Sequence, residues 1–165
     1  MTRAVRRSPL PQDSLLARHA RPGDHTDCYT AEVPEEVGLA ALVEAFYCSR
    51  GFLPERLVLA LVGRGGTRAD ARALARGEAD RFAAWRVLAR GERELLLLDV
   101  LGRTCSWLAV EPLAAGTRLC FGTGIIRRDR DRPGARAENA AFDALLPFHA
   151  AYARVLLGAA ARRLA

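Results

Sequence analysis

The sequence predicts an α+β domain in which a curved antiparallel sheet of about five strands packs around a long C-terminal helix. Two changes of apolar spacing lead to this prediction. Apolar residues recur at helical spacing over positions 39–47, alternate with polar ones over 81–128, and return to helical spacing from Phe142 onward. We expect the element order β-α-α-α-β-β-β-β-α, because the apolar stripe of a long helix needs a large apolar surface and a twisted sheet supplies one.

The N-terminal half supplies one predicted strand and three predicted helices. Residues 27–34 alternate in the manner of a short strand. The stripe over 39–47 predicts the first helix, which a glycine ends. The apolar run 53–63 has a proline in its first turn and predicts a short buried helix. Thr67 predicts the N-cap of a third helix, with Asp70 at the capping-box position.

The second half predicts a four-stranded meander and the terminal helix. The short connections rich in glycine predict strands at 81–90, 94–100, 103–113 and 117–128. On the third of these strands Arg103 and Trp107 share one face. Gly122 and Gly124 within the fourth indicate a bend or the close approach of another element. Pro147 either kinks the terminal helix or begins its well-formed part.

Composition bounds the organisation and the cellular context. The 165 residues fit a single domain at 27–165, preceded by a flexible basic arm at 1–26. The arm has no apolar centre of a secretory signal, and no apolar run approaches the ~18 residues of a membrane span, so we expect a cytoplasmic protein. The four cysteines lack metal-ligand spacing, and we expect no metal and no cofactor.

The net charge of +6 does not by itself predict nucleic-acid binding. All the basic residues are arginines, they are scattered along the chain, and acidic residues dilute their densest run at 127–132. Basic patches interleaved with exposed aromatic residues are absent from the sequence. We therefore expect no nucleic-acid partner.

The element order resembles one known superfamily, through the phrases DCYTAEVP, FAAWRV, DVLGRTCSWLAVEP, GTRLCFGTG and PFHAAYARVLL. Over roughly residues 27–160 the chain resembles uncharacterised bacterial members of the helix-grip superfamily, also called SRPBCC or START-like. The resemblance implies a cavity between the curved sheet and the C-terminal helix, which in such proteins often holds an apolar small molecule. Five predicted strands, where six or seven are usual, imply a smaller cavity or none.

His149 is the most informative polar residue of the terminal helix. It lies seven residues after Phe142 and seven before Leu156, so it shares their stripe and faces the sheet. One interpretation is a neutral structural histidine that is hydrogen-bonded to a strand or a hydroxyl. The other is a cavity-lining histidine that orients the polar group of a ligand or moves a proton.

Arg103 and the two tryptophans each allow two interpretations. Arg103 either pairs with Asp99 across a surface turn or faces inward with Trp107 to bind a carboxylate or phosphate. Trp85 and Trp107 lie in mid-strand, as core residues do, although core and ligand wall coincide in a cavity of this type. Hydroxyl groups for such a cavity are available from Tyr47, Thr123 and Tyr152.

The sequence therefore favours a domain that binds an apolar or aromatic small molecule. The expected ligand-binding residues are Trp85, Arg103, Trp107, Phe121, His149 and Tyr152. One alternative is a cyclase- or dehydratase-like enzyme in which His149 is the acid or base and Arg103 or Tyr152 stabilises developing charge. Another is an interaction protein whose cavity is filled by its own side chains. Motifs of serine hydrolases, zinc proteases, P-loops and dinucleotide-binding folds are absent from the sequence.

Overall fold

One antiparallel sheet with helices on both faces forms the protein. The computed structural model describes residues 4–49, 52, 65–127, 129 and 132–165. The chain is α+β, with a curved, open sheet of seven strands in the order β1-β2-β7-β6-β5-β4-β3. The strands are β1 (Arg6–Arg7), β2 (His25–Val33), β3 (Arg81–Phe82), β4 (Trp85–Arg90), β5 (Glu94–Asp99), β6 (Thr104–Pro112) and β7 (Thr117–Ile125).

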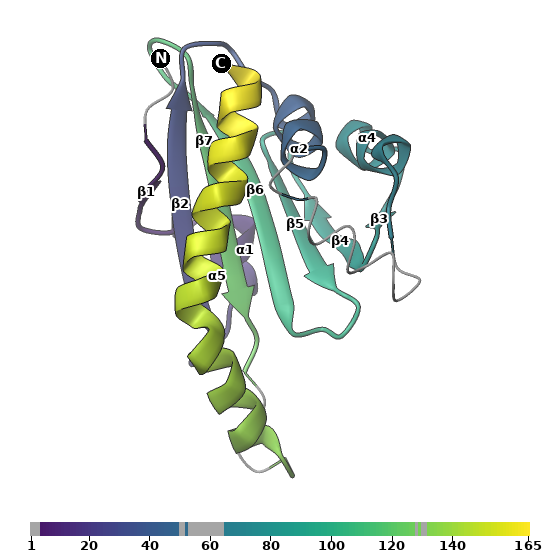
Figure 1. Ribbon diagram of the computed structural model, residues 1–165, viewed down its shortest axis with the longest axis vertical. Helices are drawn as coiled ribbons and strands as arrows, with labels where there is room; N and C mark the ends of the chain where they lie inside the picture. Colours follow the sequence, from purple (N-terminus) through teal and green to yellow (C-terminus); the bar gives the residue numbers. More distant parts are fainter. Residues whose placement is uncertain (1–3, 50–51, 53–64, 128, 130–131) are drawn as a thin grey trace.

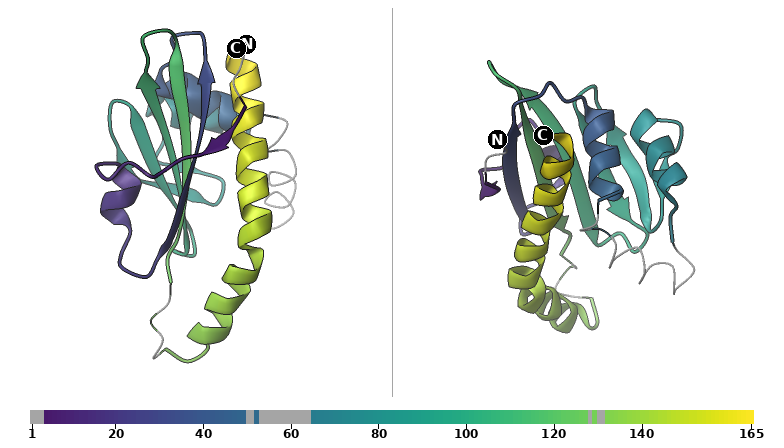
Figure 2. Two further views of the ribbon diagram at one scale, coloured as in Figure 1. Left: turned by 90° about the vertical axis from the view of Figure 1, so that its left-hand side faces the viewer. Right: turned by 45° about the horizontal axis from the view of Figure 1, so that its top comes forward.

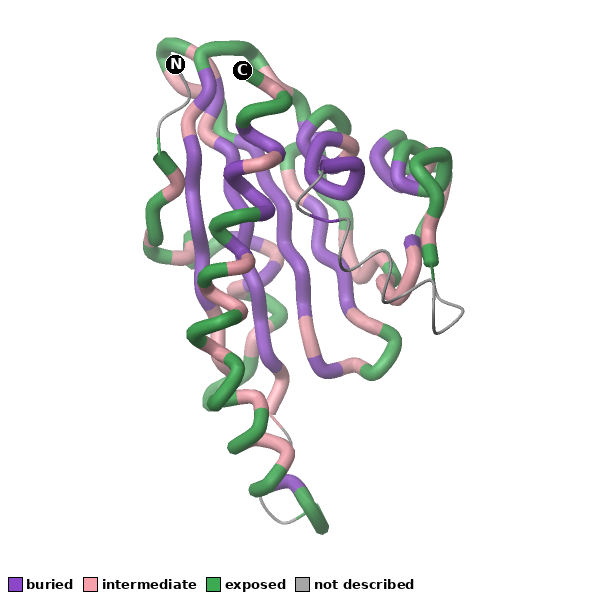
Figure 3. The backbone as a smooth tube through the Cα atoms, in the orientation of Figure 1, coloured by how far each residue is buried: buried purple, intermediate pink, exposed green. Residues whose placement is uncertain are grey.

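The helices divide between the two faces of the sheet (Figures 1 and 2). The long helix α5 (Ala135–Leu164) runs along the inner face, where α2 (Leu39–Tyr47) and α4 (Arg68–Arg76) also pack. The short helix α1 (Leu15–His19) covers the opposite, outer face. Central strands are therefore buried on both sides, as the continuous buried stretches in Figure 3 show.

The predicted meander and terminal helix are confirmed, with shifted boundaries. Strands β4 to β7 pair in sequence order, and a left-handed residue, Ala83 with φ 51°, separates β3 from β4 within the predicted strand 81–90. Helix α5 begins at Ala135, seven residues before the predicted stripe, and contains Pro147 in its interior. Figure 2 shows α5 bending in its N-terminal half, as expected where a proline removes one helical hydrogen bond.

Of the helices predicted around residues 53–77, the second can be compared with the structure. Helix α4 begins at the predicted N-cap: the hydroxyl of Thr67 accepts from the backbone N–H of Asp70, whose carboxylate accepts from the N–H of Thr67. The left-handed Gly77, with φ 76°, ends it. The predicted helix at 53–63 lies outside the described residues.

The segment predicted to be a flexible arm is part of the sheet assembly. Strand β1 pairs with β2, and the N-cap of α1, Ser14, accepts from the N–H of Ala17. Leu16 is 1% exposed and packs on the outer face of the sheet. A Cβ atom at Gly122 would lie 3.0 Å from Leu16 and 2.8 Å from Trp107, so the strand glycine marks the close approach of α1.

Helix α5 also has the composition of a membrane span. Within the described residues it is the one helix of sufficient length and mean hydropathy, and 33% of its most apolar 18-residue window is buried in the protein. Ala153, Leu156 and Leu157 form its buried face against the sheet and α2. Packing against the sheet accounts for the apolar character of that face.

Register between the central strands places the polar residues of the inner face in one row. Asp27 of β2 lies opposite Thr123 of β7, and Thr123 lies opposite Ser106 of β6. In neighbouring antiparallel strands, opposite residues point to the same face. The row therefore crosses the sheet beneath α5, and its residues Thr123 and Ser106 form part of the floor of the site described next.

Candidate functional site

A cavity of about 220 Å³ lies between the inner face of the sheet, α2 and α5. Its wall is mostly aromatic, and the ring-bearing residues are Phe46, Tyr47, Phe52, Trp85, Phe121 and Tyr152. Further polar groups come from Thr104, Ser106, Thr123 and His149, in addition to the hydroxyls of the tyrosines and the indole N–H of Trp85. A concave apolar wall with a few convergent polar groups is the usual form of a small-molecule site.

Packing between α2 and the sheet fixes the aromatic wall. The rings of Phe46 and Phe121 lie 4.6 Å apart, and Tyr47 meets Phe52 edge to face at 5.1 Å. Both distances fall in the range of favourable aromatic pairs. The hydroxyl of Tyr47 reaches the floor and lies 3.3 Å from the hydroxyl of Ser106. The wall is therefore built from interlocked rings rather than from independently mobile side chains.

A buried carboxylate lies beside the floor of the cavity. The side chain of Asp27 is 4% exposed and accepts hydrogen bonds from the hydroxyls of Thr123 and Tyr29. The Nε2 atom of His25 lies 3.9 Å from its Oδ2 atom. Burial and the neighbouring carboxylate raise the pKa of Tyr29, which keeps its phenol protonated as a donor. Three partners thus hold Asp27 in place, and one of them, Thr123, also lines the cavity.

His149 enters the cavity from α5, and within the described part of the chain its Nε2 atom has no hydrogen-bond partner. Burial lowers its pKa, and the negative charge of Asp27 opposes that shift. The imidazole is therefore neutral at pH 7, and Nε2 accepts or donates according to its tautomer. The buried Nε1 atom of Trp85, which can only donate, likewise has no hydrogen-bond partner among the residues that the structure describes.

The structure brings four of the six sequence-predicted residues together. Trp85, Phe121, His149 and Tyr152 all line the cavity. Tyr47 and Thr123, which the sequence suggested as hydroxyl donors, line it as well. Sequence reasoning missed Phe46, Phe52, Ser106 and Ala153, which have no polar signature or lie on strands whose inner face could not be identified.

Trp107 does not reach the cavity. It lies on the outer face of the sheet with Leu16, and its Nε1 donates to Glu94 Oε2 at 2.8 Å. The same carboxylate oxygen accepts from the N–H of Leu15 at the start of α1. The tryptophan is therefore part of the surface on which α1 packs. Its position does not support the prediction that it binds ligand.

Arg103 also lies away from the cavity lining. Its guanidinium is 2.5 Å from Glu138 Oε2 and lies over the ring of Phe142 at 4.5 Å, both on α5. Asp99 accepts instead from the backbone N–H of Arg103 and the hydroxyl of Thr104. Neither predicted role holds geometrically: the side chain forms no ion pair with Asp99 and does not share a face with a cavity tryptophan.

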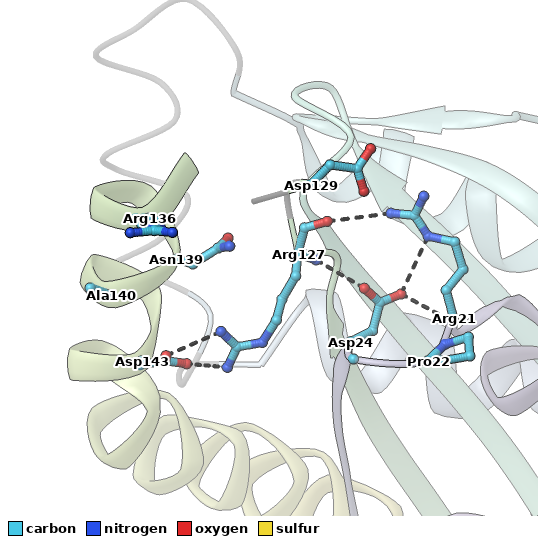
Figure 4. Close-up of a pocket in the computed structure, with 10 residues that line it drawn as sticks. Arg21, Pro22, Asp24, Arg127, Asp129, Arg136, Asn139, Ala140 and Asp143 are labelled. Carbon is cyan, nitrogen blue, oxygen red and sulfur yellow. Dashed lines mark hydrogen bonds and ion pairs between the residues drawn. The ribbon is translucent and has the colours of Figure 1, made fainter. Parts of the chain in front are cut away.

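A second, polar pocket of about 660 Å³ lies beside the N-terminal half of α5 (Figure 4). Arg127 forms a two-pronged ion pair with Asp143 of α5, and its backbone N–H donates to Asp24. Asp24 also accepts from the N–H of Arg21. The ion pair lowers the pKa of Asp143. Because these charged groups pair with one another, we interpret them as a structural network. The network holds α5 against the ends of β2 and β7.

Comparison with known proteins adds no relative to this description. Within the described part of the chain, no group of three or more metal-ligating side chains is gathered at one place. No protein-family model, curated protein or solved structure matches this chain.

Proposed function

We propose that this protein binds a small apolar or aromatic molecule in the cavity between α5 and the sheet. The observation that carries the proposal is the aromatic-walled cavity of about 220 Å³, which contains few polar groups. Burial of apolar ligand surface would supply the affinity, at about 25 cal/mol per Å². The few polar groups would fix the ligand's orientation.

The volume limits the size of the ligand. An apolar protein cavity of about 150 Å³ is large enough to take up benzene. A cavity of about 220 Å³ therefore suits one aromatic ring with a few added atoms, or a short aliphatic chain. It is smaller than the roughly 300–1,000 Å³ of sites for drug-sized molecules. The same open volume argues against the alternative of an interaction protein whose own side chains fill the cavity.

Filling the cavity tests the proposal. Ala153 of α5 is 1% exposed and lines the cavity, whereas Ala151 on the same helix is exposed. We expect toluene, indole and hexanol to raise the melting temperature of the wild type and of Ala151→Leu. In Ala153→Leu the added side chain occupies ligand space, so calorimetric affinity should fall at least tenfold. The absence of binding by all three compounds to the folded wild type would refute the proposal.

A second candidate function is an enzyme that uses His149 as a base. The observation in its favour is a neutral imidazole in the cavity, close enough to Asp27 for the carboxylate charge to act on its pKa. In a dehydration, His149 would take the α proton of a β-hydroxy carbonyl compound and return it to the departing hydroxyl, which leaves as water. The test uses small β-hydroxy ketones as substrates and measures product formation through the absorbance of the enone. An equal rate in His149→Gln would eliminate this candidate.

A further inference from the structure

The geometry points to a narrower ligand class: we infer that the cavity selects a neutral, single-ring aromatic carbonyl compound whose oxygen accepts a hydrogen bond from Trp85 Nε1. This inference rests on the proposed function, because it specifies which small molecules the same cavity prefers. It depends on two buried polar atoms without protein partners and on the absence of charge from the described lining.

The unpartnered atoms define the polar part of the ligand. Among the described residues, the buried side-chain atoms with no protein hydrogen bond are Ser49 Oγ, Trp85 Nε1 and His149 Nε2, and the last two belong to cavity-lining residues. A pure hydrocarbon in the cavity would leave both atoms without a hydrogen bond, which is unfavourable for buried polar groups. A ligand that restores these bonds must carry an acceptor for the indole N–H, which has no acceptor capacity of its own.

A carbonyl oxygen meets this requirement with the least additional volume. One ring bearing an acetyl or formyl group fits a cavity of about 220 Å³. The aromatic rings of Phe46, Phe121 and Tyr152 provide faces and edges for the ligand ring. A hydroxyl on that ring would suit His149 Nε2, because a hydroxyl can pair with either tautomer of the neutral imidazole.

The electrostatics of the cavity disfavour binding of the corresponding carboxylic acids, which are anions at neutral pH. Among the described residues that line the cavity, none is Arg, Asp or Glu. The carboxylate of Asp27, which accepts a hydrogen bond from the lining residue Thr123, would repel an anion. A buried carboxylate with no cationic partner is strongly disfavoured. An aryl ketone should therefore bind and the corresponding benzoate should not.

Four probes separate these contributions in the full-length wild-type protein. Acetophenone and α-methylstyrene have nearly the same shape, but only the ketone has an acceptor oxygen. Benzoate adds a negative charge, and 4-hydroxyacetophenone adds a hydroxyl. By titration calorimetry we expect acetophenone to bind about tenfold more tightly than α-methylstyrene, the gain typical of one hydrogen bond. Benzoate should bind at least a hundredfold more weakly than acetophenone, and 4-hydroxyacetophenone at least as tightly as acetophenone.

The two tryptophans supply a matched pair of variants. Trp85→Phe should remove the tenfold preference for acetophenone and change the affinity for α-methylstyrene by no more than about twofold. Trp107→Phe, on the outer face of the sheet, should change neither affinity. The indole N–H signal of Trp85, identified by its persistence in Trp107→Phe, should shift downfield with acetophenone and not with α-methylstyrene. Because this signal is measured with Trp85 in place, it tests the hydrogen bond even if Trp85→Phe does not fold.

The outcomes distinguish this inference from the proposed function. Equal affinity of the wild type for acetophenone and α-methylstyrene, or for acetophenone and benzoate, overturns the inference while binding of apolar molecules stands. An unchanged Trp85 indole signal with bound acetophenone also overturns it. Failure of all aromatic probes to bind the folded protein removes the proposed function itself.

Discussion

His149 makes the stability of the folded protein depend on pH, because charging a buried imidazole costs free energy. Because burial lowers its pKa in the folded protein, the unfolded chain binds a proton at this residue more readily than the folded one does. The resulting stability is present at pH above the unfolded value of about 6.5 and is lost as the pH falls below it. Acidification from pH 7.5 to 5 should therefore destabilise the wild type.

Urea unfolding of matched variants measures this contribution. His149→Gln should lose less free energy of unfolding than the wild type over the same pH interval, because a glutamine does not titrate. Ala151→Gln, at an exposed position of the same helix, supplies the control and should keep the wild-type pH dependence. Identical pH dependence in wild type and His149→Gln would contradict a buried neutral imidazole at this position.

Trp107 shows why the faces of single residues were difficult to predict. Alternation separates the two faces of a strand, but it identifies the inner face only when the other one is polar. In β6 the stretch from Cys105 to Val110 is buried on both faces, because α1 packs on one and α2 on the other. The sequence correctly grouped Trp107 apart from Ser106, yet it contained no signal for which group faced α5.

At the scale of elements, Arg103 anchors the N-terminal half of α5. Its side chain is 6% exposed, contacts Glu138 and Phe142, and donates to the carbonyl of Ile126 at 3.2 Å. Arg103→Met should lower the free energy of unfolding by about 2 kcal/mol, through loss of the charged hydrogen bonds and the cation–π contact. Amide hydrogen exchange in the first turns of α5 should accelerate in the same variant.

An exposed ion pair formed by another arginine provides the comparison for Arg103. Arg6 is 59% exposed where it meets Glu32, so Arg6→Met should cost less than about 1 kcal/mol in the same urea measurement. Equal effects of the two substitutions, or unchanged exchange at the start of α5 in Arg103→Met, would show that Arg103 has no anchoring role.

Periodicity predicted the long elements well and the short ones poorly. Strands β4 to β7 and the C-terminal half of α5 contain enough residues to establish a repeat. Strands β1 and β3 contain two residues each, which is too short for any period, and they account for the two strands beyond the predicted five. Helix α1 carries a single apolar pair, Leu15 and Leu16, and its place depends on long-range contacts with Glu94 and Gly122.

At the scale of the whole molecule, the cysteines should report on global unfolding. Cys28, Cys105 and Cys120 are buried, and burial raises their pKa values to about 11, 12 and 12. Because thiolate is the reactive form, iodoacetamide at pH 8 should modify them only as fast as the folded protein opens. Rapid alkylation of these residues in the folded protein would contradict their placement; Ala151→Cys, on an exposed surface, supplies the reactive control.

The close seat of α1 on the outer face has a consequence for the opposite side of the sheet. Leu16 packs over Gly122 and Gly124 of β7 so closely that a Cβ atom at either glycine would lie 3.0 Å from it. The alternate residues of that strand, Phe121 and Thr123, form part of the cavity wall. A single β-strand thus separates Leu16 on the outer face from the cavity on the inner face. A larger or smaller side chain at residue 16 should shift that strand and so change the volume of the cavity from outside, without altering any residue that lines it.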